Sequence, residues 1–121
     1  MILVIPNSVL KDSSSIFTES DFKKAAIKAV KGLGINLPSV LKNAKTVKVR
    51  FTSKSGAGRA IFLIKKTEDI TILVLSKLKS SRVGQNMSPE NPQFTKIITG
   101  AVKYAFADIK NKKTKVINLN Y

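Results

Sequence analysis

The fold is decided by residues 46–79, which read TVKVRFTSKSGAGRAIFLIKKTEDITILVLSKLK. Residues 46–52 alternate between apolar and polar side chains, which is typical of a strand with one face in water. Residues 59–66 and 70–79 are apolar on both alternating faces, as in central strands covered on both sides. A glycine-containing loop and a Thr-Glu-Asp turn separate the three runs. We therefore predict three consecutive antiparallel strands.

The residues before this segment predict a strand and two helices. Residues 1–5 are apolar and end at Pro6, which suits a short strand. The serine-rich residues 8–17 suggest a loop, with room for a helical turn. Ser20 is a candidate N-cap for a helix that ends near Gly32. A second, shorter helix is predicted over residues 37–43, with a proline in its first turn.

The residues after this segment predict a loop, a long helix and a last strand. Residues 80–91 are rich in glycine, asparagine and proline, which is typical of a loop. Asn91 and Pro92 suit the cap and first position of a helix whose apolar stripe runs to Ile109. Residues 114–120 alternate as an edge strand does. The expected fold is a single α+β domain over residues 1–121, in the order β-α-α-β-β-β-α-β, with an antiparallel twisted sheet packed against helices.

The composition favours some binding partners and excludes some kinds of catalysis. The 121 residues include 22 Lys and Arg against 7 Asp and Glu, a net charge of +15. Such a charge favours polyanionic partners, with nucleic acid first, an acidic protein second and an anionic membrane third; a merely lysine-rich, soluble surface is the plain alternative. Cysteine and histidine are absent, which removes thiolate chemistry, the commonest general base and the commonest neutral metal ligand. The acidic residues have no metal-ligand spacing, so no metal and no cofactor are expected. No targeting segment or membrane span is visible, so a cytoplasmic location is the default expectation.

Antiparallel pairing gathers basic residues at one end of the sheet. If the turn is centred near Glu68, Arg59 pairs opposite or close to Lys77 across neighbouring strands. Lys54 lies in the loop before Arg59, at the same end. Facing like charges are destabilising unless water or an anion separates them, and arginine and lysine can clamp a phosphate. The predicted phosphate-binding cluster is therefore Arg59, Lys77 and Lys54, which are the catalytic candidates if this end is a nuclease site. The predicted nucleic-acid contacts are Lys48, Arg50, Lys79, Arg82, Gly56 and Gly58.

The glycines and the aromatic residues permit two interpretations each. Gly56 and Gly58 allow backbone amides to approach a phosphate, but glycines are also common in ordinary hairpin turns. Phe51 and Phe62 are interpreted as core, although an aromatic exposed beside Arg50 could stack on a base. Tyr104 lies next to the apolar stripe of the last helix and is also interpreted as core.

Three local phrases resemble the RelE/ParE/HigB-type toxins of bacterial type II toxin–antitoxin systems. Residues 54–62, KSGAGRAIF, are similar to that family's strand start, and residues 72–77, ILVLSK, to its apolar strand ending in tyrosine-alanine-lysine. Residues 86–90, NMSPE, are similar to its helix entry. The similarity covers about residues 37–98, and the first 36 residues agree only in the order of elements.

The resemblance implies a RelE-like fold and a small endoribonuclease. Such a toxin cleaves mRNA, often on the ribosome, without metal or histidine, and a cognate antitoxin protein inhibits it. The family's phosphate-contacting arginine corresponds to Arg59, and its lysine at the end of the next strand to Lys77. The chain departs from the family where Gly58 and Leu75 replace aromatic residues. A gyrase-directed or degenerate relative and a non-catalytic basic nucleic-acid-binding module remain alternatives.

Overall fold

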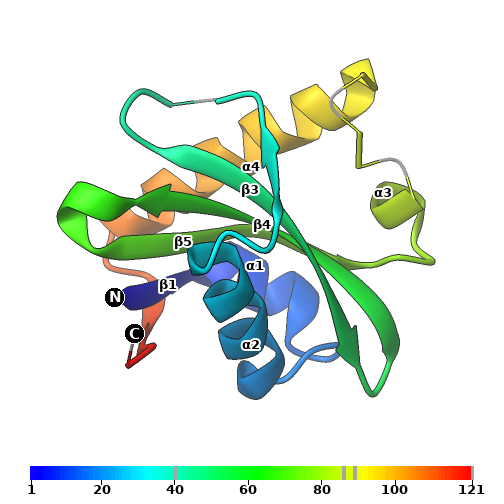
Figure 1. The fold of residues 1–121 in the computed structure, drawn as a ribbon, viewed down its shortest axis with the longest axis horizontal. Coiled ribbons are helices and arrows are strands. Elements are labelled where there is room, and N and C mark those ends of the chain that lie inside the picture. The colour runs from blue at the N-terminus through cyan, green and yellow to red at the C-terminus, as the bar shows by residue number, and fades with distance from the viewer. Residues whose placement is uncertain (40, 86, 89, 121) are drawn as a thin grey trace.

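The computed structural model describes residues 1–39, 41–85, 87–88 and 90–120, which form a mixed twisted sheet with helices on both faces (Figure 1). The sheet has six strands in the order β2-β3-β4-β5-β1-β6. The strands are β1 (Ile2–Pro6), β2 (Ile35–Leu37), β3 (Lys45–Ser53), β4 (Gly56–Lys65), β5 (Ile70–Leu78) and β6 (Thr114–Asn118). The helices are α1 (Asn7–Ser13), α2 (Glu19–Val30), α3 (Arg82–Gln85) and α4 (Pro92–Lys110), with a 3-10 turn at Lys66–Glu68.

The three predicted central strands are confirmed as β3, β4 and β5. They pair antiparallel in sequence order, and Arg59 lies opposite Lys77 as predicted. The turn between β4 and β5 closes at Asp69, which adopts the left-handed conformation with φ of 57°. The prediction that β3 has a fully solvated face is wrong, because Thr46 and Lys48 on that face are buried.

The sheet is mixed, so the prediction of an antiparallel sheet is wrong for one pair. Strand β1 runs parallel to β5, from Ile2 beside Ile70 to Val4 beside Ile72. The amino group of Met1 forms an ion pair with Asp69 at 2.9 Å, and the Ile2 N–H donates to the Asp69 carbonyl. These contacts start β1 at the same end as β5, which makes the pair parallel. Strand β6 lies at the edge, as predicted, and pairs antiparallel with β1.

The N-terminal helices differ from the prediction. Residues 7–13 form helix α1 instead of a loop, and the Asp108 side chain of α4 accepts the Ser8 N–H at 2.9 Å. Helix α2 is capped by Thr18, not by Ser20. The Thr18 hydroxyl accepts the Asp21 N–H, and the Asp21 carboxylate accepts the Thr18 N–H, which is a capping box.

The predicted helix over residues 37–43 is wrong for the residues described there. Ile35–Leu37 form strand β2, which pairs with Thr46–Lys48 of β3. Leu37 precedes a proline, and a residue in that position disfavours the helical conformation. Asn43 has a φ of 64°, which a helix cannot contain. Residue 40 lies outside the described part.

The C-terminal half follows the prediction more closely. Helix α4 begins at Pro92, and the Asn91 side chain accepts the Gln93 N–H at 3.0 Å, as expected of an N-cap. The predicted loop over residues 80–91 contains the short helix α3, while residues 86 and 89 lie outside the described part.

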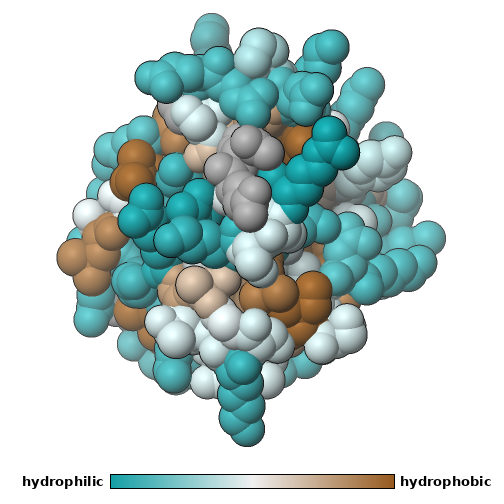
Figure 2. Space-filling view, turned by 90° about the vertical axis from the view of Figure 1, so that its right-hand side faces the viewer, coloured by the Kyte–Doolittle hydropathy of each residue, from teal (hydrophilic) through white to brown (hydrophobic). Residues whose placement is uncertain are grey.

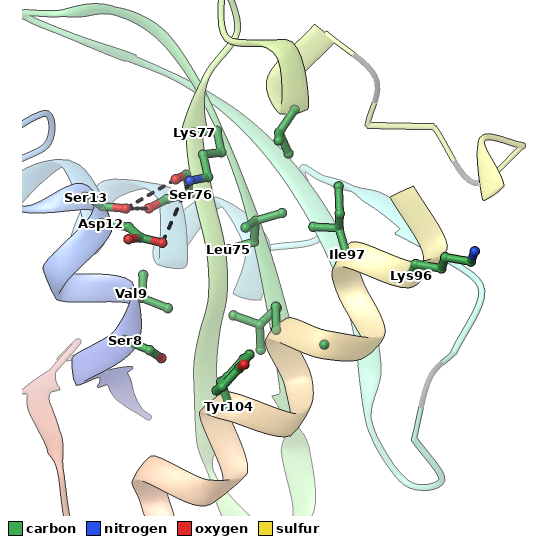
Figure 3. Close-up of a pocket in the computed structure, with 14 residues that line it drawn as sticks. Ser8, Val9, Asp12, Ser13, Leu75, Ser76, Lys77, Lys96, Ile97 and Tyr104 are labelled. Carbon is green, nitrogen blue, oxygen red and sulfur yellow. Dashed lines mark hydrogen bonds and ion pairs between the residues drawn. The ribbon is translucent and has the colours of Figure 1, made fainter. Parts of the chain in front are cut away.

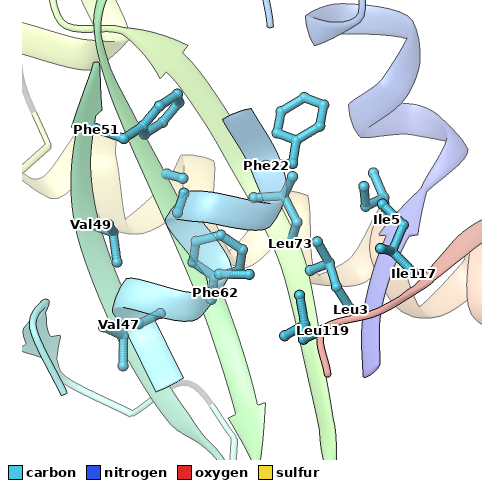
Figure 4. Close-up of a cluster of buried hydrophobic side chains, with 14 of the residues drawn as sticks. Leu3, Ile5, Phe22, Val47, Val49, Phe51, Phe62, Leu73, Ile117 and Leu119 are labelled. Atoms are coloured by element: carbon cyan, nitrogen blue, oxygen red, sulfur yellow. The ribbon is translucent and has the colours of Figure 1, made fainter. Parts of the chain in front are cut away.

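Two apolar clusters cover the two faces of the sheet. Helices α1 and α2 cover one face, where Phe22, Phe62 and Leu73 pack together (Figure 4). Helix α4 covers the other face, where Phe94 and Ile98 pack on Ile61 and Leu63. Strands β4 and β5 are thus buried from both sides, as their apolar sequences predict.

Candidate nucleic-acid interface

A basic depression lies at the end of the sheet where the β3–β4 hairpin turns. The register places Arg50 opposite Arg59, which in turn lies opposite Lys77. The depression has a volume of about 250 Å³. Four of its lining side chains are cations and none is acidic; the lining residues are Lys28, Arg50, Phe51, Thr52, Ala57, Gly58, Arg59 and Lys79. This end of the molecule, which also bears α3, has a mainly hydrophilic surface (Figure 2).

Arg59 is anchored by the polypeptide that follows β5. Its Nη1 donates to the Gly84 carbonyl of α3 at 2.7 Å. Its Nε is buried and has no hydrogen-bond partner in the described residues. A buried donor without a partner is costly, so an acceptor that reached it would gain affinity. One edge of the guanidinium is therefore bound by the protein, and another lacks an acceptor.

Lys48 is buried near Arg59 and is also bound to a backbone carbonyl. Its side chain is 9% exposed, and its Nζ donates to the Met87 carbonyl at 2.8 Å. Burial lowers the pKa of the Lys48 ammonium, and the charges of Arg59 and Arg50 lower it further. Two neutral carbonyls thus bind two cations, and no carboxylate of the described residues forms an ion pair with either of them.

Helix α3 lies so close to β5 because residue 84 is glycine. A Cβ at Gly84 would lie 2.0 Å from the Leu78 carbonyl oxygen, which is too close for any other residue. The Ser81 hydroxyl donates to the same carbonyl at 2.7 Å and accepts the Gly84 N–H at 3.0 Å. These contacts hold the Gly84 carbonyl where it binds Arg59.

Lys77 shares a row of the sheet with Arg59 but binds a different partner. Its Nζ lies 3.9 Å from the Asp12 carboxylate of α1 (Figure 3). Its side chain lines a separate groove between α1, β5 and α4. Arg59 and Lys77 therefore lie opposite each other in register, as predicted, but the Arg59 guanidinium lines the depression and the Lys77 ammonium lines the groove.

The other predicted residues are distributed around the hairpin end. Lys54 is exposed at the hairpin turn and does not line the depression. Lys79 lines the depression beside Arg50, and Arg82 is exposed on α3. Sequence reasoning missed Lys28 of α2, whose Nζ donates to the Arg50 carbonyl at 2.6 Å. No local pattern could identify Lys28, because only the packing of α2 against β3 brings it there.

The glycines of the hairpin have structural roles. Gly56 has a φ of +123°, which a side chain would strain. The Ser53 hydroxyl donates to the Gly56 carbonyl, and the Ser55 hydroxyl to the Ile16 carbonyl, so the turn is anchored to the α1–α2 connection. A Cβ at Gly58 would lie 2.5 Å from the Phe51 ring. The Phe51 ring thus fills the space that an aromatic residue at position 58 would need.

The depression can bind an anion and stabilise developing negative charge. Its cations form no ion pair with any acidic residue of the described part, since the ion pairs there involve other groups. Its lining provides no carboxylate, tyrosine or histidine to act as a general base. No group of three or more potential metal-binding side chains occurs among the described residues.

Comparisons with protein-family models, with curated proteins and with solved structures find no match for this chain. None of the helices in the described part is both long enough and apolar enough to cross a membrane.

Proposed function

We propose that the chain binds RNA through the basic depression and acts as a RelE-like toxin, a metal-independent endoribonuclease that cleaves mRNA and inhibits translation. The observation that carries this proposal is the depression itself, in which Arg59, Arg50 and Lys79 gather with no acidic residue. RNA phosphates are the common ligands of such a surface, because arginine and lysine bind them by charge-assisted hydrogen bonds. The three phrases that resemble the toxin family specify this ligand further.

The proposed reaction is a transesterification within the RNA. The ribose 2′-hydroxyl attacks the adjacent phosphorus and loses its proton, while the 5′-oxygen of the next nucleotide leaves and gains one. Arg59 stabilises the negative charge that develops on the phosphate oxygens, and Arg50 and Lys79 hold the flanking phosphates. Lys54 and Lys77 lie outside the depression, so we assign them to outer contacts with the RNA instead of to the reacting phosphate.

The partners of this proposal are RNA, on or off the ribosome, and a cognate antitoxin. A net charge of +15 favours an acidic antitoxin segment by complementarity. A gene for a small acidic protein beside the gene for this chain would support this part of the proposal.

The test is cleavage of a defined mRNA in an in vitro translation reaction containing the purified protein. Arg59→Gln is expected to reduce cleavage at least 100-fold, since removing one charge-stabilising donor typically costs about 10²–10³ in rate. Lys110→Gln removes the same charge from the exposed end of α4 and should leave cleavage unchanged. Equal cleavage by wild type and Arg59→Gln, or no cleavage by either, would refute the nuclease assignment.

The absence of a general base from the depression favours a second candidate, a non-catalytic RNA-binding module. This candidate predicts binding without cleavage. The logarithm of the association constant would fall linearly with the logarithm of salt concentration, and many lysines would contribute similarly. Filter binding of a short single-stranded RNA at several salt concentrations, with its length checked afterwards on a gel, separates the two candidates.

A further inference from the structure

Tyr104 is the one strongly exposed aromatic residue among those described. Its side chain is 69% exposed, whereas Phe17, Phe22, Phe51, Phe62 and Phe94 are buried, and Phe106 is partly buried against the core. The prediction that Tyr104 belongs to the core is therefore wrong. An exposed aromatic ring can stack on a nucleobase.

Tyr104 lines a groove of about 330 Å³ between α1, β5 and α4 (Figure 3). Apolar side chains, among them Leu75, Val83 and Ile97, form most of its surface. Gly100 lies one helical turn before Tyr104, and a Cβ there would meet no atom within 4 Å. The missing side chain leaves open space beside the ring, and that space can accept a flat group.

Charged and polar groups lie at the border of this groove. Lys96 and Lys77 provide cations, and Asp12 and Ser8 provide oxygen atoms on the α1 side. A ligand with a flat apolar body, polar edges and a negative backbone complements this arrangement. A nucleobase attached to phosphates has these properties, and unpaired bases commonly stack on aromatic side chains.

The groove adjoins the basic depression through α3. Val83 of α3 lines the groove, and the next residue, Gly84, binds Arg59 through its carbonyl. A nucleic-acid strand whose phosphate contacts Arg59 can therefore continue across α3 toward Tyr104.

We propose that the groove binds one unpaired nucleobase of single-stranded RNA, stacked on Tyr104. This inference rests on the proposed RNA binding at the depression and adds a base-binding site to it. Tyr104 contributes base affinity, and the cations contribute phosphate affinity.

The chain permits a direct optical test. It contains no tryptophan and two tyrosines, so Tyr121→Phe leaves Tyr104 as the only tyrosine emitter. In this background, a short oligoadenylate is expected to quench tyrosine fluorescence as it binds. Inorganic polyphosphate of matched charge should bind the depression without quenching, because it has no base to stack.

Three substitutions complete the test. Tyr104→Leu should weaken oligoadenylate binding by about 5- to 150-fold, the range expected for one stacked base, and leave polyphosphate binding unchanged. Tyr104→Phe keeps the ring and should bind oligoadenylate like wild type. Gly100→Leu fills the space beside Tyr104 and should weaken oligoadenylate binding while the tyrosine remains.

The possible failures are distinguishable. If the protein binds both oligoadenylate and polyphosphate, but Tyr104→Leu changes neither affinity, the base site is refuted and the RNA-binding depression stands. Equal quenching by the two ligands also refutes the base site. If the protein binds neither ligand, the proposed function fails and the base site fails with it. Circular dichroism checks that each variant is folded.

Discussion

The basic depression and the Tyr104 groove are neighbours of opposite character. The depression is lined by Lys28, Arg50, Arg59 and Lys79 and lacks any acidic residue. The groove is mainly apolar, and of its two cations, Lys77 and Lys96, Lys77 is paired with Asp12. Binding at the depression should therefore weaken steeply with salt, whereas stacking in the groove should respond to salt much less.

The difference in charge between the two surfaces arises from the elements that lie beside β4 and β5. Strand β4 lies between β3 and β5, so Arg59 meets neighbouring cations and the carbonyl of Gly84. Strand β1 pairs with β5 only as far as Ile72, after which α1 runs beside β5. Lys77 consequently meets the Asp12 carboxylate of α1. Arg59 and Lys77 thus share one row of the sheet, yet Arg59 lies on a surface without acidic residues and Lys77 is paired with a carboxylate.

The largest expected effect comes from the hairpin that frames the depression. Gly58→Tyr introduces the aromatic residue that the toxin family has at this position, but its Cβ would overlap the Phe51 ring. We expect a loss of about 1–3 kcal/mol of unfolding free energy, as for other overpacked sites, measured by urea denaturation. The groove should be unaffected, because neither position 58 nor Phe51 lines it.

The matched control is Gly100→Ala. Gly100 lies inside α4 with open space around it, and replacing a helical glycine by alanine stabilises by up to about 1 kcal/mol. The two glycine substitutions should therefore shift stability in opposite directions. A Gly58→Tyr variant as stable as the wild type would show that the Phe51 ring can move aside. The depression would then tolerate an aromatic side chain at position 58.

Sequence reasoning succeeded where the pattern is local and failed where a partner is distant. The three central strands follow from their side-chain periodicity. The turn at Asp69, together with a register shift between Ile61 and Phe62, sets Arg59 opposite Lys77. The extent of helix α1 could not be predicted, because an acceptor for its Ser8 N–H comes from Asp108, one hundred residues away. Strand β2 has three residues and exists only because the edge of β3 pairs with it.

The site shows the same division. The basic residues of the hairpin end were predictable, because antiparallel strands bring their ends together. The carbonyl that binds Arg59 and the burial of Lys48 both depend on the path of the chain around α3. The exposure of Tyr104 was misjudged because Tyr104 lies next to the apolar stripe of α4. The sequence does not show which residues at the border of that stripe are covered by the sheet.

A smaller effect is expected from Lys48, which is buried near Arg59 and makes the stability of the fold depend on pH in the alkaline range. Its pKa is lower in the folded protein than the 10.5 of an unfolded chain. Below the lowered pKa both states are charged, and the folded state bears the full cost of burying the ammonium. As pH rises from that pKa toward 10.5, the unfolded state retains more protons, so the stability contributed at Lys48 increases.

Lys48→Met removes this titration. The melting temperature of wild type relative to Lys48→Met should therefore rise between neutral pH and pH 10, because neither burial nor the fixed charges of Arg59 and Arg50 disfavour a neutral Lys48 amine. Comparing the two proteins at each pH cancels the titration of the other lysines. A difference that stays constant with pH would mean that water or an anion already compensates the buried charge.

The smallest effect is expected at the other end of the pH scale and in the other region. Asp108 accepts the Ser8 N–H at the start of α1, a wall of the groove, and this hydrogen bond lowers the pKa of the Asp108 carboxyl below 3.8. The stabilisation is therefore fully present above pH 3.8 and is lost as pH falls through the folded-state pKa.

Asp108→Asn keeps an acceptor for Ser8 but removes the charge that favours the positive end of α1. We expect a loss of roughly 0.3–1 kcal/mol at neutral pH, typical of a charge at a helix end, and a difference from wild type that shrinks as the pH falls below 3.8. Thermal unfolding of both proteins across this range measures it. Helix α1 borders the groove and not the depression. If the two surfaces bind independently, Asp108→Asn should therefore slightly reduce the quenching of Tyr104 fluorescence by oligoadenylate and leave polyphosphate binding unaltered. A loss of polyphosphate binding instead would mean that α1 and the depression are mechanically coupled and that the two surfaces act as one site.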